Sequence, residues 1–357
     1  MKKILCLIDS LGSGGAQRQL VGLAKLLNDK EEYNVKVVWY HDKNFYQKYL
    51  EENNVQYENI VVKNKFTKFF TIYKAVKDFS PDVVIAYIDG PAVIASVIRM
   101  FNSNFRLIVS ERNTTQKLNL KSKIKFYLYK RADIIVPNSY SQARFIERNY
   151  PNLYSKVRTI TNFTDTDFFS PATYAESSEC VNILVVGRIV EQKNVLLFIK
   201  AISKIIEKGV NIKVDWYGVP YYKEYYEKCV AEINKLKVNS FTFHSHSSDV
   251  RSLYRKANVF CLPSLYEGYP NVICEAMSCG LPILCSNVCD NPNIVEHGVN
   301  GFLFDPNDIN DIVEKILIFL SLPITERVTM GEKSRNIAIE KFSKITFLKK
   351  YENIICQ

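Results

Sequence analysis

Short apolar runs alternate with stretches of helical periodicity along most of the sequence, and this alternation limits the possible folds more than any other feature. Most runs are apolar throughout rather than at every second residue, as expected for strands covered on both faces. Such strands with helices between them predict an α/β fold with parallel sheets. We expect strands at residues 3–8, 35–39, 57–62, 83–86, 107–109 and 134–136, and again at 181–186, 211–217, 241–246 and 258–262.

The length and one linker indicate two domains. A chain of 357 residues is long for one hydrophobic core and sufficient for two. Residues 161–171 (T-N-F-T-D-T-D-F-F-S-P) have the character of a hinge, and a small, polar stretch follows at 172–179. We therefore expect one domain at residues 1–170, a second at 171–340, and a helical end that includes 341–357.

Cysteine usage and hydropathy indicate a cytoplasmic protein. The nine cysteines are odd in number and form no C-x-x-C pair, which favours reduced thiols over a disulfide framework. The N-terminal apolar run is interrupted by Asp9, unlike a signal peptide. No stretch reaches the roughly 18 to 20 apolar residues that span a bilayer.

The positive charge is concentrated in the first half of the chain. Residues 1–170 hold 26 of the 47 lysines and arginines but only 16 of the 37 aspartates and glutamates, so they carry the whole net charge of +10. We expect an anionic partner for this half, such as a membrane surface, a lipid diphosphate or a nucleic acid.

Two stretches, at residues 63–77 and 117–131, interleave lysines with aromatic side chains. Basic-aromatic amphipathic helices suit peripheral contact with an anionic membrane. The alternative is a helix with an apolar core face and a solvated lysine face. Two such stretches in one domain favour the membrane interpretation, and no recognisable module favours nucleic acid.

The segment 263–283 (P-S-L-Y-E-G-Y-P-N-V-I-C-E-A-M-S-C-G-L-P-I) predicts a strand end, a loop and a helix from Pro270 to about residue 279, closed by Gly280. Open amides at a helix N-terminus suit phosphate, and flanking carboxylates accept hydrogen bonds from sugar hydroxyls. This pattern fits a nucleotide-sugar, with Glu275 on the ribose and Glu267 on the transferred sugar. The alternative is a capped surface helix with two solvated glutamates.

This segment resembles the signature of retaining glycosyltransferase family 4, whose GT-B fold has two Rossmann-like domains facing across a cleft. The resemblance extends over nearly the whole chain, through G-G-A-Q-R-Q-L at 14–20, S-E-R-N at 110–113, N-S-Y-S at 138–141, G-R-I-V-E-Q-K-N at 187–194 and H-G-V-N-G-F-L-F at 297–304. It implies that the first domain is the acceptor side, that the second binds the donor, and that the terminal helix returns to the first domain.

The donor site implied by the resemblance involves residues from both domains. The loop with Gly14 and Gly15 would face the donor diphosphate and the acceptor, the alternative being a plain tight turn. The chain near His246 would lie against the base. Around the start of the predicted helix at 270, the donor-binding residues would be Gly268, Tyr269, Pro270, Asn271, Val272 and Glu275. Arg112 stands where many relatives carry a histidine, and it would bind a phosphate of the donor or the acceptor, next to Glu111.

Arg188 and Lys193 are expected to bind one diphosphate. We predict that a helix begins at Lys193, and a cation at a helix N-terminus opposes the dipole. A purely structural role is therefore less attractive than phosphate binding, which also agrees with the family pattern. Together with Glu267 and Arg112, these two residues form the predicted catalytic set.

No metal site is expected. Asp165 and Asp167 form a D-x-D pattern, but they match the family's linker and are interpreted as structural. His244, His246 and the cysteines at 274, 279, 285 and 289 lack the spacing of a zinc site. The family is generally metal-independent, and no cofactor is expected.

The resulting hypothesis is a retaining hexosyl- or N-acetylhexosaminyltransferase. Its donor would be a nucleotide-sugar, a UDP-sugar rather than a GDP-sugar, and its acceptor a lipid-linked saccharide in the synthesis of a surface polysaccharide such as capsule or O-antigen. It would act in the cytoplasm, peripherally at the inner face of the cell membrane. Two alternatives remain: another GT-B enzyme, such as a nucleotide-sugar epimerase or a phosphorylase, and a non-catalytic nucleotide-sugar-binding protein.

Overall fold

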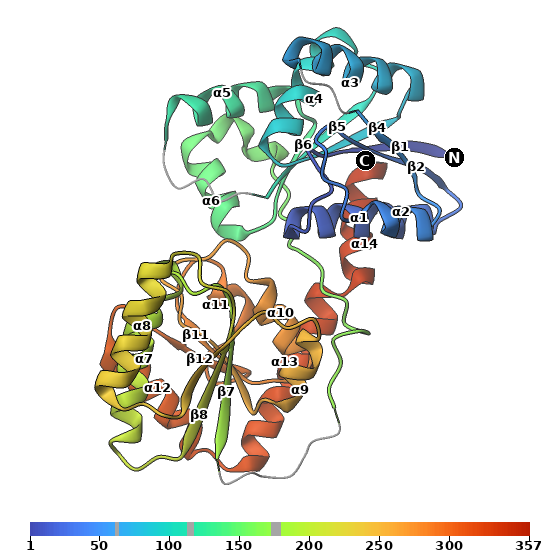
Figure 1. Cartoon of the computed structure of the whole chain (residues 1–357). Helices are drawn as coiled ribbons and strands as arrows, with labels where there is room; N and C mark the ends of the chain where they lie inside the picture. Colours follow the sequence, from blue (N-terminus) through green and yellow to red (C-terminus); the bar gives the residue numbers. More distant parts are fainter. Residues whose placement is uncertain (61–63, 113–117, 173–179) are drawn as a thin grey trace. The chain divides into compact units, whose positions relative to one another are not determined.

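A computed structural model describes residues 1–60, 64–112, 118–172 and 180–357. The chain forms two compact units, each described here by itself (Figure 1). The first unit contains Met1–Phe163 together with Ile345–Gln357, and the second contains Thr164–Lys344. The polypeptide therefore passes from one unit to the other twice, within the predicted linker and again before the last helix.

The first unit is built on a parallel six-stranded sheet in the order β3-β2-β1-β4-β5-β6. Because the order reverses direction between β1 and β4, the carboxyl ends of these strands form a topological switch point, where open α/β sheets bind ligands. The strands are β1 (Lys2–Leu7), β2 (Tyr33–Trp39), β3 (Gln56–Asn59), β4 (Val83–Tyr87), β5 (Arg106–Glu111) and β6 (Ile134–Pro137).

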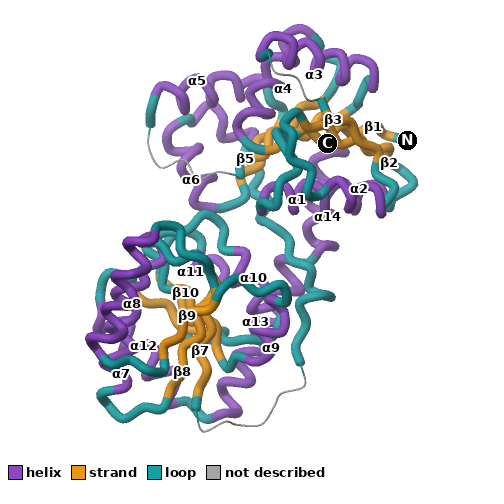
Figure 2. The backbone as a smooth tube through the Cα atoms, viewed as in Figure 1, coloured by secondary structure: helices purple, strands orange, loops and turns teal. Residues whose placement is uncertain are grey.

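Helices cover both faces of this sheet, and each face has its own buried cluster (Figures 1 and 2). One face packs against α1 (Gly15–Asn28), α2 (Gln47–Glu52) and α14 (Lys344–Cys356). The other packs against α3 (Lys65–Phe79), α4 (Asp89–Phe101), α5 (Leu120–Leu128) and α6 (Tyr140–Asn149), with the 3₁₀ turns η1 (Tyr129–Arg131) and η2 (Pro151–Lys156).

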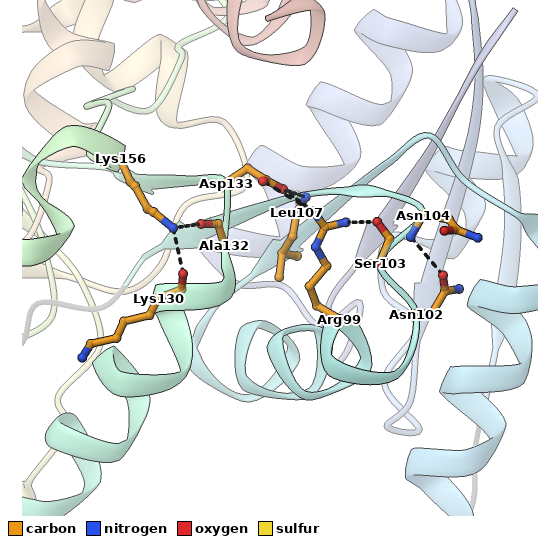
Figure 3. Close-up of polar contacts among 9 residues, drawn as sticks. All are labelled: Arg99, Asn102, Ser103, Asn104, Leu107, Lys130, Ala132, Asp133 and Lys156. Atoms are coloured by element: carbon orange, nitrogen blue, oxygen red, sulfur yellow. Dashed lines mark hydrogen bonds and ion pairs between the residues drawn. The ribbon is translucent and has the colours of Figure 1, made fainter.

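Polar contacts at the amino-terminal edge of the sheet join elements of the first unit to one another (Figure 3). Arg99, at the end of α4, contacts the Asp133 carboxylate at 3.3 Å and donates to the Ser103 carbonyl at 2.7 Å. Asp133 also accepts from the Leu107 amide. Lys156 donates to the carbonyls of Lys130 and Ala132. These groups satisfy backbone atoms at strand and helix ends, so this edge is structural.

The second unit repeats the architecture with a parallel sheet in the order β12-β11-β10-β7-β8-β9. Its switch point lies between β7 and β10, which pair directly. The strands are β7 (Val181–Val186), β8 (Ile212–Tyr217), β9 (Phe241–His244), β10 (Val259–Leu262), β11 (Ile283–Ser286) and β12 (Gly301–Phe304). Most of their side chains are buried, as the continuous apolar runs predict.

Two layers of helices also enclose this second sheet (Figure 2). The cluster on one face includes α7 (Val195–Ile206), α8 (Lys223–Leu236) and α12 (Ile309–Ser321). The other cluster includes α9 (Val250–Lys256), α10 (Asn271–Ser278), the short α11 (Asn291–Ile294) and α13 (Ile324–Phe342). Short connections, among them the 3₁₀ turn η3 (Glu191–Lys193), lie at the strand ends.

The D-x-D pair lies where the chain enters the second unit. Lys344 contacts Asp165 at 2.8 Å and Asp167 at 3.5 Å, and the Thr164 amide donates to the Phe342 carbonyl. The two carboxylates therefore bind a lysine that joins the entering and leaving segments. Among the described residues, no group of three or more histidines, cysteines, aspartates or glutamates is arranged to hold a metal ion.

The two lysine-rich stretches are amphipathic, but one lysine lies inside. In α3, Phe66 and Phe70 are exposed, whereas Phe69 and Tyr73 pack against the core. In α5, Ile124 and Tyr127 are exposed, whereas Phe126 and Lys125 are buried. The expectation of a uniformly solvated lysine face is therefore wrong for Lys125, because acidic groups of the sheet edge bind its ammonium. Lys63 and Lys117 lie outside the described residues.

Candidate active site

The predicted donor residues of the second unit follow β7 and β10, the two strands at its switch point. Arg188 comes directly after β7, Lys193 lies in η3, and Glu267 lies in the loop after β10. Because the carboxyl ends of parallel strands lie at one edge of a sheet, the fold gathers residues that are far apart in the sequence. This edge is where a ligand of an open α/β sheet binds.

Lys193 and Glu267 form an ion pair at the centre of this edge. The Lys193 Nζ atom lies 2.5 Å from Glu267 Oε1, and the two side chains are only 12% and 11% exposed. The stem of Lys193 lies across Gly187, where a Cβ atom would come within 3.3 Å of Lys193 Cε. A neighbouring glycine, Gly218, admits the Gly187 carbonyl, which any Cβ at 218 would meet at 2.0 Å.

The local structure around Lys193 differs from the prediction. Lys193 ends a 3₁₀ turn, and the α-helix begins two residues later at Val195. Asn194 has a φ of 58°, a left-handed conformation that separates the two, and its side-chain Nδ2 donates to the Pro306 carbonyl. The prediction that a helix begins at Lys193 is therefore wrong, and the argument from an opposed dipole does not apply. The contact with Glu267 accounts for the place of the lysine instead.

The Glu267 loop is held by Gln192 and Cys289. The Gln192 carbonyl accepts from the Leu265 amide at 2.9 Å, and the Gln192 side chain donates to the Tyr266 carbonyl. The Glu267 amide donates to the Cys289 sulfur at 3.5 Å. Cys289 has a φ of 52°, which is strained for a residue with a Cβ. These contacts tie the Glu267 loop to the turn that carries Lys193.

The helix α10 begins at Asn271, with Pro270 in the preceding cap position, one residue later than predicted. The Asn271 amide donates to Tyr269 and the Ile273 amide to Pro270, so neither is open as the sequence suggested. Gly280 has a φ of 79°, and the Leu281 amide donates to Ala276, a closure of the kind expected of a glycine there.

Glu275 lies inside the second unit. It is 6% exposed, and its Oε2 accepts a hydrogen bond from the Tyr254 hydroxyl at 3.1 Å. The alternative interpretation, a solvated glutamate on a surface helix, is therefore wrong for Glu275. The same holds for Glu267, since its side chain is mostly buried against Lys193. Gly268 and Val272 flank the start of the same helix.

Arg188 is exposed at this edge, and its guanidinium lies 5.2 Å from the centroid of the Tyr221 ring. No ion pair of Arg188 occurs within the described part of the chain. His246 is also exposed, two residues past the end of β9. The neighbouring His244 is engaged elsewhere, because its Nε2 lies 2.7 Å from Asp215 and its ring stacks on Tyr217.

The predicted residues of the first unit form a separate group at that unit's own switch point. Gly14 is the cap residue of α1 and Gly15 its first residue, after β1. Arg112 follows β5 and donates to four neutral groups: Ser110 Oγ, Asn162 Oδ1, Tyr87 OH and Tyr351 OH, at 2.7 to 3.0 Å. Arg112 thus joins β4 and β5 to the linker and to α14.

Glu111 is the centre of a buried network that the sequence reasoning missed. Its carboxylate accepts from Lys125 at 2.8 Å and from the Tyr129 hydroxyl at 2.6 Å, and Lys125 also contacts Asp89 at 3.2 Å. Burial raises the pKa of Glu111, although Lys125 opposes this rise. Asp89 follows β4 directly, which was the available signal. Through this network Glu111 anchors α5 to the sheet.

Two cavities lie at opposite edges of the second unit. The larger, of about 920 Å³, is at the amino-terminal edge, where Arg255 and Arg335 donate to carbonyls of the linker. The other, of about 770 Å³, lies at the carboxyl edge and is lined by Arg188, Val190, Glu191, Gln192, Tyr221, Tyr222, Lys223, Glu224, Tyr225, Lys228 and Tyr266. Of these two cavities, the second contains one residue of the predicted site, Arg188.

Comparison with known proteins identifies the architecture and the class of enzyme. Residues 171–337 match the family described as "Glycosyl transferases group 1". The chain is similar to the structure of a glycosyltransferase from Rickettsia africae ESF-5, with a TM-score of 0.86 and 20% identity over 99% of this chain and 97% of that one. It is equally similar to Anabaena HepE in complex with UDP, with a TM-score of 0.86 and 18% identity over the full length of both. The predicted GT-B fold, two Rossmann-like domains, is confirmed.

Among curated proteins, the chain is similar to a Campylobacter jejuni enzyme named GalNAc-alpha-(1->4)-GalNAc-alpha-(1->3)-diNAcBac-PP-undecaprenol alpha-1,4-N-acetyl-D-galactosaminyltransferase. The two are 28% identical over 340 residues, which cover 90% of this chain and 89% of that protein. An Escherichia coli protein named UDP-Gal:alpha-D-GlcNAc-diphosphoundecaprenol alpha-1,3-galactosyltransferase is 28% identical over 56% of this chain and 53% of its own length.

Proposed function

This chain belongs to group 1 of the glycosyl transferases and is a glycosyltransferase, and from that premise we propose that it moves a sugar from a UDP-sugar to a lipid-linked saccharide. Transfer retains the configuration of the sugar, and the product contributes to a surface glycan. The Anabaena relative that binds UDP supports the donor. The curated relatives named for undecaprenol-linked acceptors support the acceptor.

The observation that carries this proposal is the Lys193–Glu267 pair at the switch point of the second unit, at the same sheet edge as Arg188. A carboxylate paired with a lysine, at an edge that also carries an arginine, suits a ligand that presents both a diphosphate and sugar hydroxyls. Phosphate oxygens need the cations, whereas sugar hydroxyls donate hydrogen bonds to the carboxylate. A nucleotide-sugar carries both groups at adjacent positions.

In the proposed mechanism, Lys193 contacts Glu267 and the diphosphate together. An ammonium group has three N–H donors, so its bond to Glu267 leaves two for phosphate oxygens. As the sugar–phosphate bond breaks, negative charge grows on the leaving diphosphate. Lys193, Arg188 and the positive end of α10 stabilise that charge where it develops. These groups supply the positive charge, so the proposed transfer requires no divalent metal.

Glu267 orients the transferred sugar in this mechanism, and Glu275 receives the ribose hydroxyls. Glu267 is held between Lys193 and the backbone contacts of its loop, so little reorganisation accompanies sugar binding. The loop with Gly14 and Gly15, the backbone near His246, and Arg112 remain proposed contacts of the donor or the acceptor. A hydrogen bond from the Tyr254 hydroxyl to Oε2 of Glu275 helps to orient that carboxylate.

Peripheral contact with an anionic membrane is part of the proposal. Phe66 and Phe70 on α3 and Leu120, Ile124 and Tyr127 on α5 are exposed apolar or aromatic side chains in the half of the chain that carries the net charge. Such side chains enter the headgroup region of a membrane while lysines contact anionic lipids. Among the described helices, none is long and apolar enough to cross a bilayer. Action at the cytoplasmic face of the membrane follows from this proposal.

The proposal is tested by thermal stabilisation of the purified chain with a panel of UDP- and GDP-sugars, with and without EDTA. A ligand of the folded state raises the melting midpoint. We expect a shift from a UDP-sugar that is unaffected by EDTA and lost in Lys193→Ala. Lys200→Ala is the matched control, because Lys200 is an exposed lysine on α7. If no nucleotide-sugar shifts the midpoint, the donor site is refuted.

A further inference from the structure

The second cavity at the carboxyl edge has a composition that a diphosphate site does not need. Four tyrosines line it, and three of them are exposed: Tyr221 by 58%, Tyr222 by 63% and Tyr266 by 48%. Glu191 and Glu224 also line it, together with Lys223 and Lys228 of α8. Carboxylates repel phosphates but accept hydrogen bonds from hydroxyl groups, so the cavity suits a ligand with many hydroxyls and apolar C–H faces.

The walls of the cavity are fixed rather than flexible. Beyond the ends of β7 and β8, the Ile189 amide donates to the Val219 carbonyl at 3.0 Å, and the Tyr221 amide donates back to Ile189 at 3.3 Å. On the other side, Gln192 bonds to the Glu267 loop through Leu265 and Tyr266. These backbone bonds tie the segments that carry Tyr221 and Tyr266 to the turn after β7.

We propose that this cavity is a subsite for pyranose rings of the saccharide acceptor, so that the second unit contributes to acceptor binding in addition to the first unit, to which the family resemblance assigns the acceptor. Tyrosine rings offer a rigid apolar face with a polar tip, and a pyranose ring presents C–H groups on its face and hydroxyls around its rim. The volume of about 770 Å³ lies within the range of small-molecule sites and admits more than one sugar ring.

The subsite contains one of the donor residues, Arg188, and adjoins the others. Arg188 lies at the border, with its guanidinium over Tyr221, whereas Lys193 and Glu267 do not line the cavity. Gln192, in the wall, precedes Lys193 directly. A sugar ring bound here therefore touches the elements that carry the donor residues. The identification of the saccharide as the acceptor rests on the proposed function. The expected affinity of the cavity for sugar rings does not depend on that function.

The test is saturation-transfer NMR on the intact chain. The probes are maltotriose and the methyl α-glycosides of glucose, galactose and N-acetylgalactosamine. We expect saturation of the ring protons of at least one probe. We expect about tenfold weaker binding in Tyr222→Ala, equivalent to 1.4 kcal/mol, and retention in Tyr222→Phe, which keeps the ring. Tyr154→Ala is the control, because Tyr154 is 65% exposed in the first unit.

Two results overturn the inference. One is the absence of saturation transfer to any probe. The other is binding that Tyr222→Ala leaves intact but that Lys193→Met abolishes, because the sugar then occupies the donor site. If UDP-sugars stabilise the chain while no free saccharide binds, the proposed function stands and this inference fails. If saccharides bind at Tyr222 while no nucleotide-sugar binds, the sugar-binding cavity is supported and the proposed function fails.

Discussion

The Lys193–Glu267 pair allows the sharpest test of the site, because its two charges should have opposite effects on ligand binding but coupled effects on stability. Lys193→Met removes the charge and keeps most of the stem that lies across Gly187. Glu267→Gln keeps the shape of the carboxylate and removes its charge. The combined variant removes both charges and completes a double-mutant cycle.

The exposure of the two side chains sets the expected loss of unfolding free energy when the pair is broken. Breaking a fully buried ion pair costs about 3–5 kcal/mol, and breaking an exposed one costs about 1 kcal/mol or less. At 12% and 11% exposure, we expect Lys193→Met to cost about 2–3 kcal/mol, since Glu267 then loses its cation. Glu267→Gln should cost less, because an amide oxygen still accepts from Lys193. The coupling energy should be at least about 1 kcal/mol.

The chain offers a specific probe of the second unit. It has two tryptophans, the buried Trp39 in the first unit and the buried Trp216 in the second. In a Trp39→Phe background, tryptophan fluorescence reports unfolding of the second unit alone. For a unit of this size a loss of 1 kcal/mol lowers the midpoint by about 2–4 °C, so Lys193→Met should melt about 5–10 °C lower.

Binding of UDP, measured by titration calorimetry, should move in opposite directions in the two single variants. Lys193→Met should weaken UDP binding at least about tenfold, because it removes a cation from the diphosphate. Glu267→Gln should bind UDP as well as the wild type or better, because it removes a repelling charge, yet it should lose sugar transfer. Additive stability losses with no coupling, or a parallel loss of UDP binding in both variants, would refute the reasoning.

Three further predictions follow from the burial of thiols, the apolar helix surfaces and the state of Asp215. Of the nine cysteines, we expect Cys180, Cys289 and Cys356 to react quickly with a thiol reagent in the folded protein, because the other six are buried. Rapid modification of more than three thiols per native chain contradicts this. Phe66→Ser with Phe70→Ser should reduce co-sedimentation with vesicles of anionic lipid several-fold, whereas Phe45→Ser, also exposed, should not; equal loss in both contradicts a role for α3. Burial raises the pKa of Asp215, but hydrogen bonds from Lys213 and His244 outweigh burial and bring this pKa below its ordinary value. The ionised carboxylate therefore stabilises the fold above about pH 4, and this stabilisation is lost as the pH falls through the lowered pKa. Asp215→Asn should therefore destabilise the second unit at pH 6 and have little effect near pH 2, and Trp216 fluorescence melts at both values check this.

Local sequence predicted most of the strands and helices. The apolar runs mark the strands because a strand covered on both faces has no polar side. Gly280 and the residues after it mark a helix end, since only glycine adopts that φ without strain. Glu267 was predicted as a site residue from its place in the loop before a helix. Lys193 was predicted from its place in the G-R-I-V-E-Q-K-N motif.

The partners of these residues were beyond local reasoning. Lys125 is indistinguishable in sequence from the solvated lysines around it, and only the packing of α5 brings it to Glu111 and Asp89. The helix start predicted at Lys193 fails because Asn194 adopts a left-handed conformation, held by a bond to a carbonyl 112 residues further along the chain. Likewise, the ring of Tyr351 reaches Arg112 only because α14 packs on the first sheet.

By itself the sequence determined the α/β class and the order of strands and helices, because periodicity is a property of neighbouring residues, and its motifs supplied the residues of the proposed donor site. The tertiary structure decided which charges meet: Lys193 with Glu267, Lys344 with the D-x-D pair, and Arg112 with two tyrosines. It also formed the tyrosine-lined cavity from loops after three different strands. The physical reason is that a parallel sheet brings the ends of distant strands to one edge, and the contacts made there depend on register and packing rather than on local sequence.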